Sequence, residues 1–249
     1  MIGQAGKELS CRPRILGVPI DCLSMKAVVA KIESFIESRE PHIVVTADSS
    51  GIVQARDDAE FNEILQTADI VTPDSEGVLW AAKRKKIFVP ERVSGVDLFA
   101  ELCQKSAEKG YRLFFLGSEP GVAEMAAERC RLTYPGVNIV GARHGYFPPD
   151  SDEIVAQEIA ATKPDVLFVA MGIPRQEKFI KRTQHILRTP VAIGVGGTLD
   201  VFSGKVRRAP KLVQTLKLEW LYRLLQNPKK MAKARNLPIF VRLVLRSRD

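Results

Sequence analysis

The chain has 249 residues, 45% of them hydrophobic and 27% charged, which is typical of a globular protein that can bury a sizeable core. No apolar run approaches the roughly 20 residues that a membrane-spanning helix needs. Residues 1–10 lack the apolar centre of a signal peptide, so we expect a cytosolic protein of one large or two small domains. Four cysteines without a CxxC pair indicate reduced thiols, neither a zinc site nor a disulfide framework.

The formal net charge of +8 is unevenly spread along the chain. Residues 204–249 hold thirteen Lys and Arg against two acids, a net +11. Residues 1–203 hold 24 basic and 27 acidic residues, a net −3. A basic C-terminal segment predicts an anionic partner: membrane lipid, a lipid diphosphate or a nucleic acid.

Strand-like and helix-like segments alternate along most of the chain. The expected strands are residues 15–20, 42–46, 70–72, 112–116, 137–141, 166–170 and 191–195. The expected helices include residues 24–38, 76–83, 96–109 and 152–162, and one that starts at a capping box formed by Asp57 and Glu60. This alternation predicts an α/β protein with a Rossmann-like, mainly parallel sheet and helices on both faces.

The alternation stops at residue 211. Apolar residues then recur at helical spacing until Asn227-Pro228, and a last helix begins near Pro238 with Arg242 and Arg246 off its apolar face. We therefore expect two units: a Rossmann-like body, residues 1–210, and a basic amphipathic helical appendage, residues 211–249.

Glycines and polar residues follow two of the expected strands. The strand at 166–170 leads to Gly172 and a polar helix, and the strand at 191–195 leads to Gly196, Gly197 and Asp200. In an open α/β sheet, ligands bind at the carboxyl ends of the strands. Glycines there let backbone N–H groups approach a phosphate, and helix N-termini favour anions. This stretch predicts half of a nucleotide-sugar pocket.

The same residues resemble the WecG/TagA/CpsF glycosyltransferase family. The matching motifs are Gly172-x-Pro-x-Gln-Glu-Lys178, Val195-Gly-Gly-Thr-x-Asp200 and Arg208-Ala-Pro210, with Thr46, Pro73-Asp74, residues 90–97 and residues 144–147 upstream. The resemblance covers nearly the whole chain from Leu16 onward. It implies transfer of a sugar from a UDP-sugar to a lipid-diphosphate-linked sugar at the cytoplasmic membrane face, in the synthesis of bacterial surface polymers such as teichoic acid.

Three residues are the catalytic candidates. A carboxylate at a strand end suits the base that deprotonates an attacking sugar hydroxyl, and the resemblance assigns this role to Asp74, whose alternative role is a helix N-cap. The resemblance also implies that Thr46 lines the active site. It places Gln176 beside the reacting sugar, and the alternative for Gln176 is an exposed first-turn residue.

The substrate-binding candidates surround these three. Asp48 shares the strand end of Thr46 and has turn capping as its alternative. The resemblance implies nucleotide binding by Asp200, and Tyr146 suits base stacking or core packing. The strand-end glycines, Gly172, Gly196 and Gly197, suit a phosphate.

The appendage supplies the remaining candidates. Arg223 matches an arginine that family members use near the diphosphate, where a guanidinium fork suits departing phosphate oxygens. Lys230 and Lys233 stand where members carry more arginines, with a solvated basic helix face as the alternative for all three residues. Docking of the amphipathic appendage on an anionic membrane surface would bring these cations over the pocket. A core or homo-oligomer interface is the alternative for the helix that carries Trp220.

Two motifs suggest other chemistry. Asp150-Ser151-Asp152 matches the DxD metal motif, but we interpret Asp150 and Glu153 as a helix capping box. The resemblance implies a metal-independent enzyme, so we expect no metal site and no cofactor. Gly117-Ser-Glu-Pro-Gly121 does not have the GxGxxG spacing of a dinucleotide site.

We therefore predict an inverting, metal-independent glycosyltransferase. The donor would be a UDP-sugar carrying N-acetylmannosamine or a uronic acid, and the acceptor a polyprenyl-diphosphate-linked saccharide. One alternative is a nicotinamide-dependent oxidoreductase on the same fold class, which would need GxGxxG. The other is a nucleic-acid-binding protein, for which the basic segment has few aromatic residues.

Overall fold

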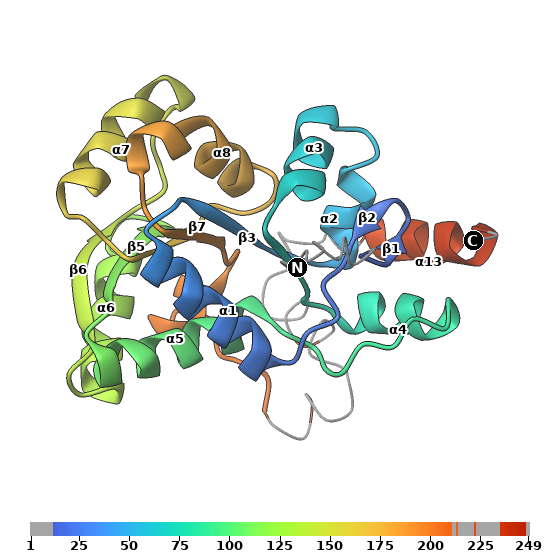
Figure 1. Ribbon diagram of the computed structural model, residues 1–249, viewed down its shortest axis with the longest axis horizontal. Helices are drawn as coiled ribbons and strands as arrows, with labels where there is room; N and C mark the ends of the chain where they lie inside the picture. The colour runs from blue at the N-terminus through green and yellow to red at the C-terminus, as the bar shows by residue number, and fades with distance from the viewer. Residues whose placement is uncertain (1–11, 211–212, 214–221, 223–234, 248–249) are drawn as a thin grey trace, which may run out of the picture.

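The computed structural model describes residues 12–210, 213, 222 and 235–247. Its centre is a six-stranded sheet in which every pairing is parallel, with the order β4-β3-β8-β7-β5-β6 (Figure 1). The strands are β3 (His42–Ala47), β4 (Ile70–Pro73), β5 (Arg112–Gly117), β6 (Asn138–Arg143), β7 (Val166–Ala170) and β8 (Val191–Gly194). The predicted parallel α/β fold is confirmed.

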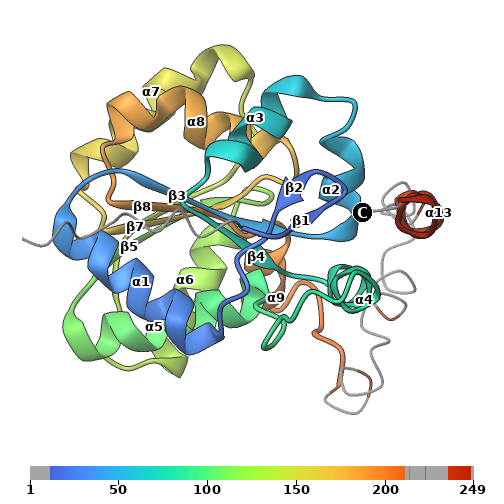
Figure 2. The same ribbon diagram turned by 45° about the vertical axis from the view of Figure 1, so that its right-hand side comes forward.

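Helices pack on both faces of this sheet, as predicted (Figures 1 and 2). One face carries α2 (Ser49–Gln54), α3 (Ala59–Thr67), α7 (Asp152–Ala161) and α8 (Arg175–Leu187). The other face carries α1 (Met25–Ser38), α5 (Gly95–Lys109), α6 (Val122–Thr133) and α9 (Thr198–Phe202).

The strands separate two hydrophobic cores. In β3, Ile43 and Val45 face the core beneath α2 and α8, whereas Val44 faces the core beneath α1 and α5. This alternation follows from the two-residue period of a strand. Because both faces are covered, the strands are nearly continuous runs of apolar residues, as expected of a buried parallel sheet.

Two further helices lie beside the β4 edge of the sheet. They are α4 (Glu76–Arg84) and α13 (Asn236–Arg246), and α13 packs against α2 and α4 (Figure 2). Its Phe240 and Val244 are almost completely buried in the core that α2 and α8 also line. The predicted last helix is therefore present and is seated on the body, while the predicted unit boundary at residue 210 stays a prediction.

Three local expectations were wrong. The segment at 15–20 is a two-residue antiparallel hairpin, β1 (Arg14–Ile15) with β2 (Val18–Pro19), because Leu16 and Gly17 turn the chain with positive φ. The N-cap of α3 is Asp58, which accepts from the Phe61 N–H at 3.0 Å, and not Asp57. A 3₁₀ turn (Pro149–Ser151) precedes α7, whose N-cap makes no side-chain hydrogen bond, so the predicted capping box is not formed.

The strand connections diverge at the carboxyl edge of the sheet, and the region between the ends of β3 and β8 is the expected ligand crevice. β3 is followed by α2 on one face, whereas its neighbour β8 is followed by α9 on the other face. Divergent connections of this kind leave room for a ligand between the two strand ends. Within the described residues, no helix is both long and apolar enough to cross a membrane.

Candidate active site

The adjacent strands β3 and β4 end at the same level of the sheet, and each is followed by an aspartate, Asp48 and Asp74. Ala47 pairs with Pro73, and the Asp74 N–H donates to the Ala47 carbonyl at 3.0 Å. Asp48 and Asp74 therefore follow adjacent strands at the same level of the sheet. Both side chains are half-buried at this edge.

Asp74 is not the N-cap of the helix that follows it. Ser75 is the N-cap, and its hydroxyl accepts from the Val78 N–H. Ser75 also bonds the Ser49 hydroxyl at 3.0 Å, which ties the start of α4 to the start of α2. The N-cap alternative for Asp74 is therefore wrong, and Asp74 directly follows the end of β4.

Asp48 and Thr46 have structural partners at the end of β3. Asp48 is the N-cap of α2 and accepts from the Gly51 N–H at 2.6 Å, which is the alternative role expected for it. The buried Thr46 hydroxyl donates to the Gly194 carbonyl at 2.8 Å. This bond joins β3 to β8 across the crevice.

Gln176 joins the ends of β7 and β8. Its side-chain oxygen accepts from the N–H of Gly172 at 3.1 Å and from that of Gly196 at 3.0 Å. The two glycines have φ of +77° and +55°, which only glycine adopts readily. Gln176 is only 1% exposed, so the exposed first-turn alternative is wrong. The amide groups expected to face a phosphate instead hold the two loops together.

Asp200 and Tyr146 lie near a lysine that the sequence did not single out. The Lys205 ammonium donates a hydrogen bond to Glu119 within an ion pair. This bond raises the pKa of Lys205 above its ordinary value. The electrostatic influence of Asp200 and Tyr146 raises the pKa of Lys205 slightly further. Tyr146 is 65% exposed, so it is not packed in the core. A nucleotide in this region would meet an aromatic ring and charged groups of both signs.

The loop before α5 is pinned against the end of β4. The Val93 N–H donates to the Pro73 carbonyl at 3.1 Å, and the Thr72 hydroxyl donates to the Val93 carbonyl at 3.0 Å. Asp97, in the first turn of α5, accepts from Arg208 at 2.5 Å. Two motifs that are more than 100 residues apart in the sequence, at 90–97 and 208–210, therefore meet beside the crevice.

The aspartates of the DxD motif are not arranged as metal ligands. Asp152 is buried and accepts from both terminal nitrogens of Arg175, one at 2.6 Å, in a bidentate ion pair. Across the described part of the chain, no three His, Cys, Asp or Glu residues are grouped so that they could hold a metal ion. Arg223, Lys230 and Lys233 lie outside the described residues.

The comparison with known proteins bears on this arrangement. Residues 13–249 match the glycosyl transferase WecG/TagA/CpsF family. Proteins named N-acetylglucosaminyldiphosphoundecaprenol N-acetyl-β-D-mannosaminyltransferase are similar to the chain. The one from Bacillus spizizenii (strain W23) is 35% identical over 89% of this chain and 86% of its own length. The one from Bacillus subtilis (strain 168) is 33% identical over 88% of this chain and 88% of its own length. The one from Staphylococcus aureus (strain MW2) is 33% identical over 91% of this chain and 89% of its own length.

Neither the oxidoreductase nor the nucleic-acid alternative accounts for a match of this extent. The match spans the body and the last helix together. It also includes every strand end that forms the crevice. The chain belongs to the WecG/TagA/CpsF family of glycosyltransferases.

Proposed function

We propose that the chain transfers N-acetylmannosamine, or a related uronic acid, from a UDP-sugar to a polyprenyl-diphosphate-linked saccharide in the synthesis of teichoic acid or a similar surface polymer. The names of the three relatives support the sugar and the lipid-diphosphate acceptor. The observation that carries the proposal is that the parallel strands β3, β4, β7 and β8 end at the same edge of the sheet, with Asp74 directly after β4.

The proposed reaction is a single displacement at the anomeric carbon of the donor. An acceptor hydroxyl oxygen forms the new bond to this carbon, and Asp74 takes the hydroxyl proton. The bond between the anomeric carbon and the diphosphate oxygen breaks, and its electron pair leaves with UDP. Inversion of an α-linked UDP-sugar gives the β-linkage that the relatives' names contain. Arg223 remains the proposed partner of the departing diphosphate.

We propose that this reaction needs no metal ion. The support is the ion pair of Asp152 with Arg175, which occupies the second carboxylate of the only DxD motif in the sequence. Cationic side chains near the crevice would then neutralise the leaving diphosphate instead of Mn²⁺ or Mg²⁺.

The proposed reaction is tested with a panel of UDP-sugars and a lipid-linked acceptor. We expect the purified chain to form product from UDP-N-acetylmannosamine or a uronic acid derivative, at a rate that excess EDTA does not change. Product is measured by chromatography of the lipid fraction, with UDP release as the second readout. Activity that disappears in EDTA and returns with Mn²⁺ would refute metal independence, and no transfer from any UDP-sugar would refute the reaction itself.

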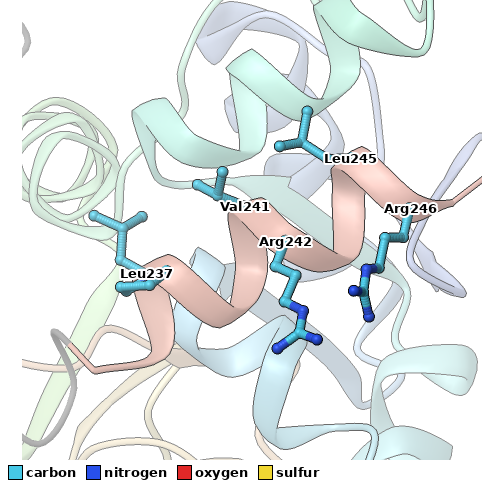
Figure 3. A pocket seen from close by; sticks show the side chains of 6 residues that line it. Leu237, Val241, Arg242, Leu245 and Arg246 are labelled. Atoms are coloured by element: carbon cyan, nitrogen blue, oxygen red, sulfur yellow. The ribbon is translucent and has the colours of Figure 1, made fainter.

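We further propose that the chain acts as a peripheral protein at the inner face of the cell membrane. The outward face of α13 carries Leu237, Val241 and Leu245, with Arg242 and Arg246 along one side (Figure 3). Apolar residues flanked by cations suit the interface of an anionic bilayer. Helix α4, which packs against α13, ends in Lys83 and Arg84 and is followed by the 81% exposed Phe88, and we propose that these residues belong to the same membrane surface.

The position of α13 supports delivery of a lipid-linked acceptor. The Asn236 side chain donates to the Ser50 hydroxyl at 2.9 Å, two residues after Asp48. A Cβ on Gly77, three residues after Asp74, would lie 3.8 Å from the Phe240 ring. Helix α13, which carries the proposed membrane surface, therefore packs against α2 and α4. These are the two helices that directly follow the catalytic ends of β3 and β4.

Removing the two α13 cations should weaken membrane binding. Each cation contributes about 1 kcal/mol on anionic lipid, so Arg242→Gln/Arg246→Gln should bind anionic liposomes about 30-fold more weakly. Flotation with anionic and neutral vesicles measures this, and turnover of a water-soluble acceptor should stay unchanged. Leu132→Ser, an 83% exposed position on α6, is the control that should float like the wild type. Equal flotation of the arginine variant would rule out this surface.

A further inference from the structure

Gln176 and Glu177 form a buried polar pair at the start of α8. They are 1% and 0% exposed, although they are consecutive residues in a polar first turn, Arg175-Gln-Glu-Lys178. A buried carboxylate is costly unless its hydrogen bonds are made. The burial of both residues at the junction of β7 and β8 therefore points to a defined task.

The hydrogen bonds specify how the Gln176 amide is oriented. Its oxygen accepts from the Gly172 and Gly196 N–H groups, which use both lone pairs. Its nitrogen donates to Glu177 Oε1 at 2.7 Å. A flipped amide would present N–H groups to two backbone donors and an oxygen to a carboxylate, so all three partners select the same orientation.

The pair is also closely packed against β8. A Cβ on Gly194 would lie 2.6 Å from Gln176 Nε2 and 2.8 Å from Glu177 Oε1. The carbonyl of the same Gly194 accepts from the Thr46 hydroxyl. Contacts therefore run without interruption from Glu177 through Gln176 to the ends of β7, β8 and β3.

We propose that Glu177 is a positioning residue for the transfer reaction. Its carboxylate orients the Gln176 amide, and the amide holds the β7 and β8 loops at the separation that shapes the crevice. Gln176 then acts on the substrate through these two loops, because its oxygen already has two donors. This inference rests on the proposed function, since the crevice is taken to hold the sugar donor.

Exchanging the two side chains tests the proposal. Gln176→Glu alone places a carboxylate against the Glu177 carboxylate, and the two repel each other when both are ionised. We expect kcat/KM to fall by about 10²-fold, the typical effect of a small misplacement. The loss should shrink as the pH falls, because one shared proton restores the hydrogen bond between the two groups.

The double variant Gln176→Glu/Glu177→Gln restores the complementary pair. The carboxylate introduced at position 176 accepts from the two glycine N–H groups, and the amide introduced at position 177 donates to that carboxylate. We expect most of the lost activity to return and the new pH dependence to disappear. Glu153→Gln, an exposed position on α7, controls for the loss of one negative charge.

The results with these variants distinguish a positioning role of Glu177 from a role in packing alone. They also distinguish a failure of this proposal from a failure of the proposed reaction. A folded double variant no more active than Gln176→Glu, or a Gln176→Glu variant with the wild-type pH profile, would overturn the proposal. If Gln176→Glu does not fold, Glu177→Met removes the hydrogen-bond acceptor of the Gln176 amide at similar side-chain volume. A tenfold or larger loss of kcat/KM at a wild-type melting temperature supports the proposal. Full activity of Glu177→Met overturns it. A wild-type chain inactive with every UDP-sugar would instead refute the proposed reaction.

Discussion

The Asp74→Asn variant is expected to keep its fold and its affinity for UDP and to lose about 10²–10⁴-fold in kcat. The substitution removes a base and preserves the shape of the side chain. The backbone at this position is held by the Asp74 N–H bond to Ala47 and by the Ser75 cap of α4, neither of which uses the carboxylate. We therefore expect the melting temperature to change little, because these backbone bonds persist and the amide has the shape of the carboxylate.

Three measurements on the purified variant check this expectation: initial rates with saturating donor, the melting temperature and UDP binding by calorimetry. Glu153→Gln, at an exposed position on α7, is the control for the loss of one carboxylate. Near-normal turnover in Asp74→Asn, or an equal loss in Glu153→Gln, would contradict the assignment of Asp74 as the base.

Phe240→Ala should destabilise the whole protein, although residue 240 is only nine positions before residue 249. The ring is completely buried among residues of α2, α4 and the sheet. Truncating a buried phenylalanine costs about 3–5 kcal/mol. In a chain of this size, that loss lowers the melting temperature by roughly 6–20 °C.

The control for this prediction is the preceding residue. Ile239 is 45% exposed, and Ile239→Ala should change the free energy of unfolding by about 0.5 kcal/mol or less. Thermal unfolding followed by circular dichroism compares the two variants. An unchanged melting temperature in Phe240→Ala would mean that α13 is a dispensable attachment, as expected of a separable appendage.

Much of the fold could be predicted because apolar periodicity is a local property. The strand at 166–170 and the helix at 25–38 are visible in a few residues of sequence. The strand order could not be predicted, because the partner of a parallel strand is set by crossovers through distant segments. Leu16 and Gly17 show a related failure, since a run of apolar residues conceals a two-residue turn.

The candidate site could be predicted only as far as its position. Glycines and acids at the ends of expected strands placed Asp74, Asp48 and Gln176 at one edge of the sheet. Their partners were not visible, because Gly196 lies 20 residues from Gln176 and Arg175 lies 23 residues from Asp152. The burial of Glu177 was missed for the same reason, since helical periodicity does not reveal which strands cover a first turn.

The place of β8 in the sheet has a consequence for how the chain folds. In the described part of the chain, β8 alone connects the β4-β3 pair to the β7-β5-β6 group, and it pairs His42 with Val191. During synthesis, β3 exposes an unpaired edge until β8, about 150 residues later in the chain, has left the ribosome. Such long-range pairing slows folding, since a large loop must close before the contact is made. The two halves of the sheet can therefore pair only after the four-residue strand β8 has been made. The same strand also supplies one side of the crevice.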